Sequence, residues 1–244
     1  MTSLTYRVLL CIALTLPACS FSNGFDRAEI QDALQYRRVL PNDPSSASGT
    51  EPASATLKPP IRLGLYFVRT QFPTRQSIQT LEWLGTEQDR LLQRLAPLRA
   101  DHTASEIVVL ADSTLAKPDR QTLRQTCTRY GLDVLAIVDG VGSVDRYNKL
   151  SSLLYLTILG AYIIPGTVSD ALFTIDATLW DVRHDRLLDR VTAEGRANKT
   201  GSAVRLEDEE PLREAQQVAL EALSNQIIDV LHRRIRMQPQ PASP

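Results

Sequence analysis

Apolar residues change their spacing in a regular order in the middle of the chain, and this order limits the possible folds. Residues 61–67 alternate between apolar and more polar side chains, which predicts a strand, and short apolar runs at 106–111 and 133–138 predict two buried strands. Apolar stripes at helical spacing predict two intervening helices, one opened by Ser77 and one ended by Gly131. A β-α-β-α-β order of this kind favours an α/β layer with neighbouring parallel strands.

The second half of the chain follows a different pattern. Period-two alternation at 173–179 and 187–193, around a polar turn, predicts an antiparallel hairpin with one packed face and one wet face. An apolar stripe then predicts a long helix over 212–235. The expected fold class is therefore α/β, with a mixed sheet from the β-α-β-α-β unit, the hairpin and a long C-terminal helix. We expect one domain at 61–237, followed by a frayed tail at 238–244.

Composition and charge exclude several classes of protein. The 244 residues are 43% hydrophobic and 23% charged, which is ordinary for a globular protein and excludes wholesale disorder, collagen and a polytopic membrane protein. With 27 basic and 28 acidic side chains the formal net charge is −1, so no long-range attraction to nucleic acid is expected. Three Cys and three His are too few and too scattered for a disulfide scaffold or a zinc ribbon.

The amino terminus has the pattern of a bacterial export signal. Residues 1–18 combine one basic residue with an apolar stretch too short to span a bilayer, which is typical of a signal peptide. Leu16-Pro17-Ala18-Cys19 resembles a lipobox, which implies cleavage before Cys19 and its modification by diacylglycerol and an acyl chain such as palmitate. An ordinary secretory signal with a coincidental Cys is the alternative. Ser20 favours the outer membrane over retention in the inner membrane.

The residues after Cys19 predict a tether. The stretch 19–60 contains one weakly amphipathic helical piece, at 27–39, which could dock on the body of the protein. The remainder is rich in Pro, Ser and Ala and has almost no large apolar residue, so it is expected to form a flexible linker. After processing and acylation Cys127 is the only free thiol, and its helical spacing predicts a small buried side chain rather than a nucleophile.

An uncharged apolar stretch at 150–165, LSSLLYLTILGAYIIP, is the most unusual part of the sequence. It is short for a transmembrane helix, and Gly160 and Pro165 interrupt it. It could form part of the core, a surface flap for self-association, or a lipid-inserting hairpin supplied by each subunit of a ring. If it is exposed, the candidate contact residues are Leu153, Leu154, Tyr155, Leu159, Tyr162 and Ile163.

Motifs for catalysis or metal binding have no positive support in the sequence. The acidic run at 207–210 lacks the alternating spacing of a calcium loop and is better explained as a helix start, and six scattered Asp residues are expected at strand ends and turns. The sequence contains neither G-x-S-x-G nor a phosphate-binding loop. We therefore expect no catalytic residues, no metal site, no cofactor and no enzymatic activity.

Three motifs carry a resemblance to a known family. The segments YGLDVLAIVDGV, LTILGAYIIPG and TIDATLWDVRHDRLL occur in that order after the lipobox, and with them the chain resembles the rhombotarget lipoproteins of bacteria. That family is associated with rhombosortase, a protease acting on Gly-Gly carboxy-terminal tails, whereas this chain ends in MQPQPASP. The resemblance implies a family member that is not itself a substrate of the protease, and it brings no activity with it.

These observations together predict a non-enzymatic outer-membrane lipoprotein on the periplasmic side. It would be held to the membrane by its N-terminal lipid and would bind an envelope protein or a second copy of itself, with no nucleic-acid partner. The alternative is a ring-forming secretion or pore component that inserts the segment 150–165. An architectural resemblance to the curli secretion channel and to the amino-terminal domain of the Tol propeller protein makes a role in envelope assembly plausible, but fold resemblance does not transmit function.

Overall fold

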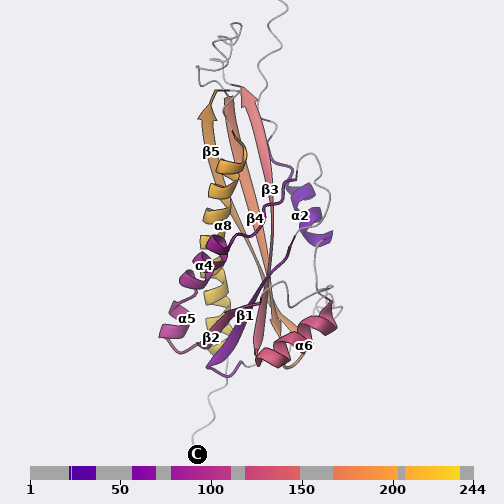
Figure 1. Cartoon of the computed structure of the whole chain (residues 1–244), viewed down its shortest axis with the longest axis vertical. Coiled ribbons are helices and arrows are strands. Elements are labelled where there is room, and N and C mark those ends of the chain that lie inside the picture. Colours follow the sequence, from indigo (N-terminus) through magenta and orange to yellow (C-terminus); the bar gives the residue numbers. More distant parts are fainter. Residues whose placement is uncertain are drawn as a thin grey trace, which may run out of the picture.

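The computed structural model describes residues 22, 24–36, 57–69, 78–110, 119–148, 167–202 and 207–236 (Figure 1). Their secondary structure consists of one sheet and the helices around it. In chain order the elements are α2 (Arg27–Tyr36), β1 (Ile61–Phe67), α4 (Gly85–Arg94), α5 (Pro97–Ala100), β2 (Ala104–Val109), α6 (Arg120–Tyr130), β3 (Val134–Asn148), β4 (Thr167–Asp181), β5 (Arg186–Gly201) and α8 (Glu209–Arg236).

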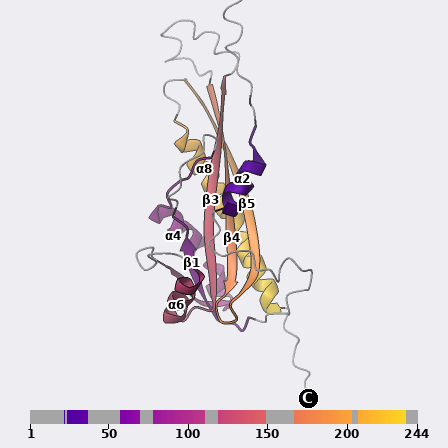
Figure 2. The ribbon, with the colours of Figure 1, turned by 90° about the vertical axis from the view of Figure 1, so that its right-hand side faces the viewer.

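The five strands form a mixed sheet in the order β2-β1-β3-β4-β5. β1 lies between β2 and β3 and is parallel to both, while β3, β4 and β5 are antiparallel to one another. This arrangement confirms the predicted fold class. The long antiparallel strands run along the length of the molecule (Figure 2).

β3 is much longer than the sequence pattern predicts. The expected strand at 133–138 continues through Gly140 and Gly142 to Asn148, and β4 pairs with it residue for residue from Val134↔Asp181 to Asn148↔Thr167. β1 reaches only Val138, so beyond this point β3, β4 and β5 alone remain of the described sheet. The prediction ended early because the added residues carry polar side chains on one face, which resembles a loop in the sequence.

The predicted start of the first long helix is wrong. The helix begins at Gly85 rather than near Ser77, which lies outside the described residues. Gln79 instead forms an isolated antiparallel bridge with Gly142, in which the N–H of each residue donates to the carbonyl of the other at 2.7 Å. The tertiary contact with β3 therefore replaces the first turns of the expected helix.

Separate apolar cores cover the two faces of the sheet. On one face, α8 and α4 enclose the larger core, which includes Phe173, Ala215 and Leu223. On the other face, α6 buries Leu123 and Cys127 against the lower part of the sheet. Figure 1 shows α8 and α4 on one side of the sheet and α6 on the other.

The predicted helical piece near the amino terminus docks on the sheet. Ile30 and Leu34 of α2 are buried against Val141 of β3 and Leu172 of β4, on the same face as α6. None of the described helices combines the length and the apolar character that crossing a bilayer requires.

Candidate functional site at the hairpin end of the sheet

The ends of several strands and of α8 meet at one extremity of the sheet. We call it the hairpin end because β3 connects to β4 there; the turn between β4 and β5 lies at the opposite extremity. β3 ends here at Asn148, β4 begins at Thr167, β5 ends at Gly201 and α8 begins nearby at Glu209 (Figure 1). Asn148 and Thr167 are partners across the strand pair, so the chain leaves and re-enters the sheet at adjacent positions. The predicted segment 150–165 connects these two positions.

The sequence-predicted site residues lie outside the described residues. This applies to the lipidation candidate and to the contact candidates, which are Cys19, Leu153, Leu154, Tyr155, Leu159, Tyr162 and Ile163. The described residues that flank these features in the chain lie at the hairpin end; they are Ser22, after Cys19, and Asn148 and Thr167, on either side of the segment 150–165.

The amino-terminal segment binds the hairpin end through Asp145. The hydroxyl of Ser22 donates to Oδ2 of Asp145 at 2.5 Å, and the backbone N–H of Gly24 donates to the same oxygen at 3.0 Å. Asp26 then caps α2, because its Oδ1 accepts hydrogen bonds from the N–H groups of Ala28 and Glu29. The segment following Cys19 is thus attached to β3 close to the end of that strand.

Two pairs of aspartates face each other across β3 and β4. Asp145 is the partner of Asp170, and Asp139 is the partner of Asp176. The expectation that these residues lie at strand ends and turns is wrong, because all four lie inside strands. Period-two spacing could have revealed their shared face, since Asp139, Val141, Ser143 and Asp145 alternate along β3.

Opposed carboxylates repel each other, and surrounding donors stabilise them here. Asp170 accepts a hydrogen bond from the Tyr147 hydroxyl at 3.1 Å. Asp176 accepts one from the Thr192 hydroxyl at 3.1 Å and lies 3.5 Å from the Arg190 guanidinium. Burial, followed by the hydrogen bond and charge of Asp170, raises the pKa of the Tyr147 hydroxyl. Asp145, Asp170 and Asp176 therefore act as hydrogen-bond acceptors that hold the strands and the amino-terminal segment together.

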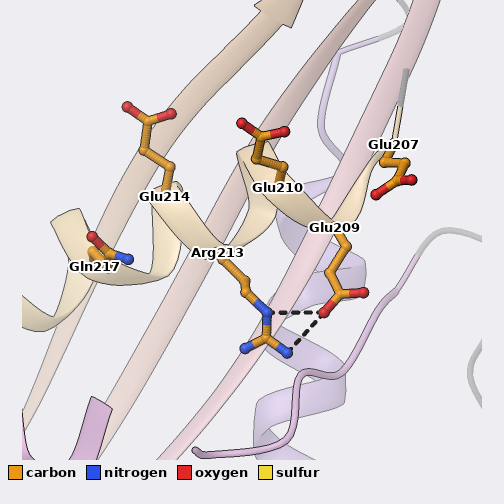
Figure 3. A pocket seen from close by; sticks show the side chains of 6 residues that line it. All are labelled: Glu207, Glu209, Glu210, Arg213, Glu214 and Gln217. Carbon is orange, nitrogen blue, oxygen red and sulfur yellow. Dashed lines mark hydrogen bonds and ion pairs between the residues drawn. The ribbon is translucent and has the colours of Figure 1, made fainter. Parts of the chain in front are cut away.

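An acidic depression of about 570 Å³ lies at the start of α8 (Figure 3). It is lined by Glu207, Glu209, Glu210, Arg213, Glu214 and Gln217. Arg213 donates to Glu209 at 2.8 Å, and Lys199 of β5 forms an ion pair with Glu210. Among the residues that the structure describes, no group of three or more carboxylate, histidine or cysteine side chains is placed to hold a metal ion. The predicted helix start is present, and the acidic residues complement the amino-terminal end of its dipole.

The remaining candidate groups make structural contacts. Cys127 is fully buried, as predicted, and burial raises the pKa of its thiol to about 12. His184 lies 2.7 Å from Asp181, and His232 lies 2.7 Å from Asp101. The first pair lies within the turn between β4 and β5, and the second pair joins α8 to the end of α5.

No family model matches the sequence, and no curated protein does. Among solved structures, the chain is similar to a PelC dodecamer from Paraburkholderia phytofirmans, with 11% identity over 71% of this chain and 92% of that chain, at a TM-score of 0.30. It is also similar to a minor lipoprotein from Acinetobacter baumannii, with 10% identity over 71% and 92% of the two chains, at a TM-score of 0.31. The LpoB C-terminal domain from Salmonella enterica has 8% identity over 58% and 86%, at a TM-score of 0.30. Values this low assign neither a family nor a function.

Proposed function

We propose that this chain is a non-enzymatic lipoprotein of the bacterial outer membrane, anchored on the periplasmic side through Cys19. It acts by binding an envelope protein or a second copy of itself through the segment 150–165. The lipobox and the three motifs shared with the rhombotarget lipoproteins support the anchor and the compartment. We include membership of that family in the proposal.

The position of the segment 150–165 in the β3–β4 hairpin carries the proposal. β3 and β4 are paired without interruption up to Asn148↔Thr167, so the segment begins and ends at an extremity of the sheet. The described elements fill the cores on both faces with their own apolar side chains. A long uncharged connection at the end of a completed sheet favours a contact surface over a missing part of the core.

The chemistry of the described polar groups is consistent with a binding role. At the hairpin end the buried Asp145 accepts hydrogen bonds from Ser22 and Gly24, and the half-buried Asp170 accepts one from Tyr147. The described thiol, Cys127, is buried and retains its proton at neutral pH because burial raises its pKa to about 12. These groups stabilise the fold.

The test measures the mass of the assembly that the full-length, processed protein forms in mild detergent. Wild type is compared with Leu159→Asp. We expect Leu159→Asp to abolish self-association, or capture of an envelope partner, while the far-UV circular dichroism stays unchanged. Val218→Asp is the matched control, because it places the same charge on a 47% exposed apolar side chain of α8, outside the segment 150–165 in the sequence. Unfolding by Leu159→Asp alone would show that the segment is core, and unchanged association would show that it is not the contact.

A ring-forming pore component remains the second candidate, and the same observation favours it. In a ring whose subunits share one orientation, every β3–β4 connection would lie on the same side of the ring. This candidate predicts a defined, detergent-resistant large oligomer in both wild type and Cys19→Ala. A monomer or dimer in both proteins would exclude it.

A further inference from the structure

We infer that the hairpin end of the sheet faces the lipid surface, and that residues 22–36 hold it in this orientation. The inference rests on the proposed acylation of Cys19. It adds to the proposed function an orientation of the molecule relative to the membrane, in which the opposite end of the sheet points away from the lipid.

Chain length limits how far the lipid can lie from the sheet. Ser22 follows Cys19 by three residues, which span at most about 11 Å. Ser22 and Gly24 bind Asp145, and three further residues of β3 lead to its end at Asn148, a rise of about 10 Å. The chain therefore allows Cys19 to lie at most about 11 Å from Ser22. Ser22 is itself bound to a residue about 10 Å from the end of the sheet.

The direction of the docked segment brings its amino-terminal end, Ser22, near the hairpin end rather than the middle of the sheet. Ser22 lies at Asp145, close to the hairpin end, whereas Ile30 and Leu34 pack farther from that end, on Val141 and Leu172. The segment therefore runs from the hairpin end toward the middle of the sheet. The lipid anchor proposed on Cys19, three residues before Ser22, would therefore extend from the hairpin end.

Two kinds of contact hold this segment in place. The apolar contacts of Ile30 and Leu34 bury both side chains to 5% exposure or less. Arg27 forms an ion pair with Glu194 of β5 at 2.9 Å, and Asp145 accepts the two hydrogen bonds described above. These contacts span β3, β4 and β5, so the docked segment restrains rotation of the sheet about its anchor.

The charge of the hairpin end selects the kind of lipid surface. Five acidic residues gather where α8 begins, and they outnumber the three described basic residues that pair with them. The acidic residues are Glu207, Asp208, Glu209, Glu210 and Glu214, and the basic residues are Arg146, Lys199 and Arg213. The last turn of α8 instead carries Arg233, Arg234 and Arg236. Carboxylates repel anionic headgroups over a Debye length of about 8 Å at physiological salt. The hairpin end therefore suits zwitterionic headgroups, such as phosphatidylethanolamine, better than anionic headgroups.

The experiment measures energy transfer from two positions on one helix to the bilayer. Glu207→Cys and Arg236→Cys lie just before α8 and at its end, separated by a helix of about 42 Å. A maleimide dye labels the introduced thiol selectively, because Cys127 is buried and Cys19 is acylated. Each full-length lipidated variant is placed in phosphatidylethanolamine and phosphatidylcholine vesicles that contain a headgroup-linked acceptor.

We expect efficient transfer from position 207 and weak transfer from position 236. Asp145→Ala and, independently, Ile30→Asp should reduce the difference by releasing residues 22–36, so failure of one variant to fold leaves the other as the test. Asp170→Asn is the matched control, because Asp170 faces Asp145 but does not bind the amino-terminal segment. Phosphatidylglycerol should lower transfer from position 207 at low salt, and added salt should restore it.

Equal transfer from the two positions, or stronger transfer from position 236, would overturn the inference. An unchanged difference in both Asp145→Ala and Ile30→Asp would show that docking does not orient the molecule. The mass of the Cys19 peptide separates this outcome from failure of the proposed function. If Cys19 is unmodified, the proposed anchor and the proposed orientation are both wrong. If Cys19 is acylated and the two positions transfer energy equally, only the proposed orientation is wrong.

Discussion

Gly195 of β5 lies at a close approach between α8 and the sheet. A Cβ atom at this position would lie 2.0 Å from the carbonyl oxygen of Ala215 and 2.5 Å from the backbone nitrogen of Ala219. Both neighbours are backbone atoms of α8, so no side-chain rotation can relieve the overlap. The absence of a side chain at one residue therefore sets the distance between the long helix and the sheet.

We predict that Gly195→Ala destabilises the protein, because α8 must move outward to admit the methyl group. Overpacking of a core costs typically about 1–3 kcal/mol. Urea unfolding followed by circular dichroism measures the loss. Gly85→Ala is the matched control, because a Cβ atom at Gly85 meets nothing within 4 Å, and its free energy of unfolding should change little. Equal stability of wild type and Gly195→Ala would show that α8 is free to shift.

Helix α6 has a capping residue at each end, Asp119 at its start and Gly131 after its last residue. The Asp119 carboxylate accepts a hydrogen bond from the N–H of Thr122 at 2.7 Å, and Gly131 adopts the left-handed conformation with φ of 63°. The N–H of Leu132 then donates to the carbonyl of Cys127 at 2.9 Å, which closes the last turn. The predicted end of this helix at Gly131 is confirmed.

We predict that Asp119→Ala lowers the melting temperature at neutral pH, because the first turn of α6 loses its cap. Hydrogen bonds from Thr122 hold the pKa of Asp119 below its usual value of 3.8. A lowered pKa means that this stabilisation is present above the unfolded-state pKa and is lost as the pH falls through the folded-state pKa. The difference in melting temperature between wild type and variant should therefore shrink in acid.

Thermal melts of wild type, Asp119→Ala and Asp119→Asn between pH 7 and pH 2 test this prediction. Asp119→Asn retains a side-chain oxygen that can accept the hydrogen bond, so at pH 7 it should melt closer to wild type than Asp119→Ala does. A gap between wild type and Asp119→Ala that widens in acid would contradict the assignment.

Over the whole molecule, one sheet joins the apolar core under α8 to the apolar core under α6. Leu65 and Ala136 point into the α8 core, while their neighbours Tyr66 and Leu135 point into the α6 core. Because β1 and β3 contribute to both cores in alternation, loss of one core removes support from the other. We therefore expect the described body to unfold in a single cooperative transition.

Chemical modification of the Cys127 thiol can measure whether unfolding is cooperative. Its thiol is fully buried and its pKa is raised to about 12, so a maleimide should modify it only when the protein unfolds. We predict that modification of the Cys127 peptide, followed by mass spectrometry in increasing urea, coincides with the loss of circular dichroism. Modification at lower urea would show that α6 opens before the rest of the sheet.

The spacing of apolar and polar residues in the sequence was sufficient to predict several elements of the fold. The alternation at 61–67 predicts β1 to its observed bounds, and the polar residues around Val182 predict the turn between β4 and β5. These predictions succeed because side-chain periodicity follows directly from helix and strand geometry. The same local reasoning misplaced the start of α4 and the end of β3.

The sequence by itself determined the fold class, the order of the elements and the motifs of the amino terminus. Only the tertiary structure decided that Asp139 faces Asp176, that Asp145 faces Asp170, and that Ser22 binds Asp145 across 123 positions in the chain. A carboxylate inside a sheet is stable only beside suitable donors, and the donors to Asp145, Asp170 and Asp176 come from other strands or from the amino-terminal segment. Local spacing contains no information about such distant partners, so a strand with polar residues resembled a loop until the sheet brought its partners together.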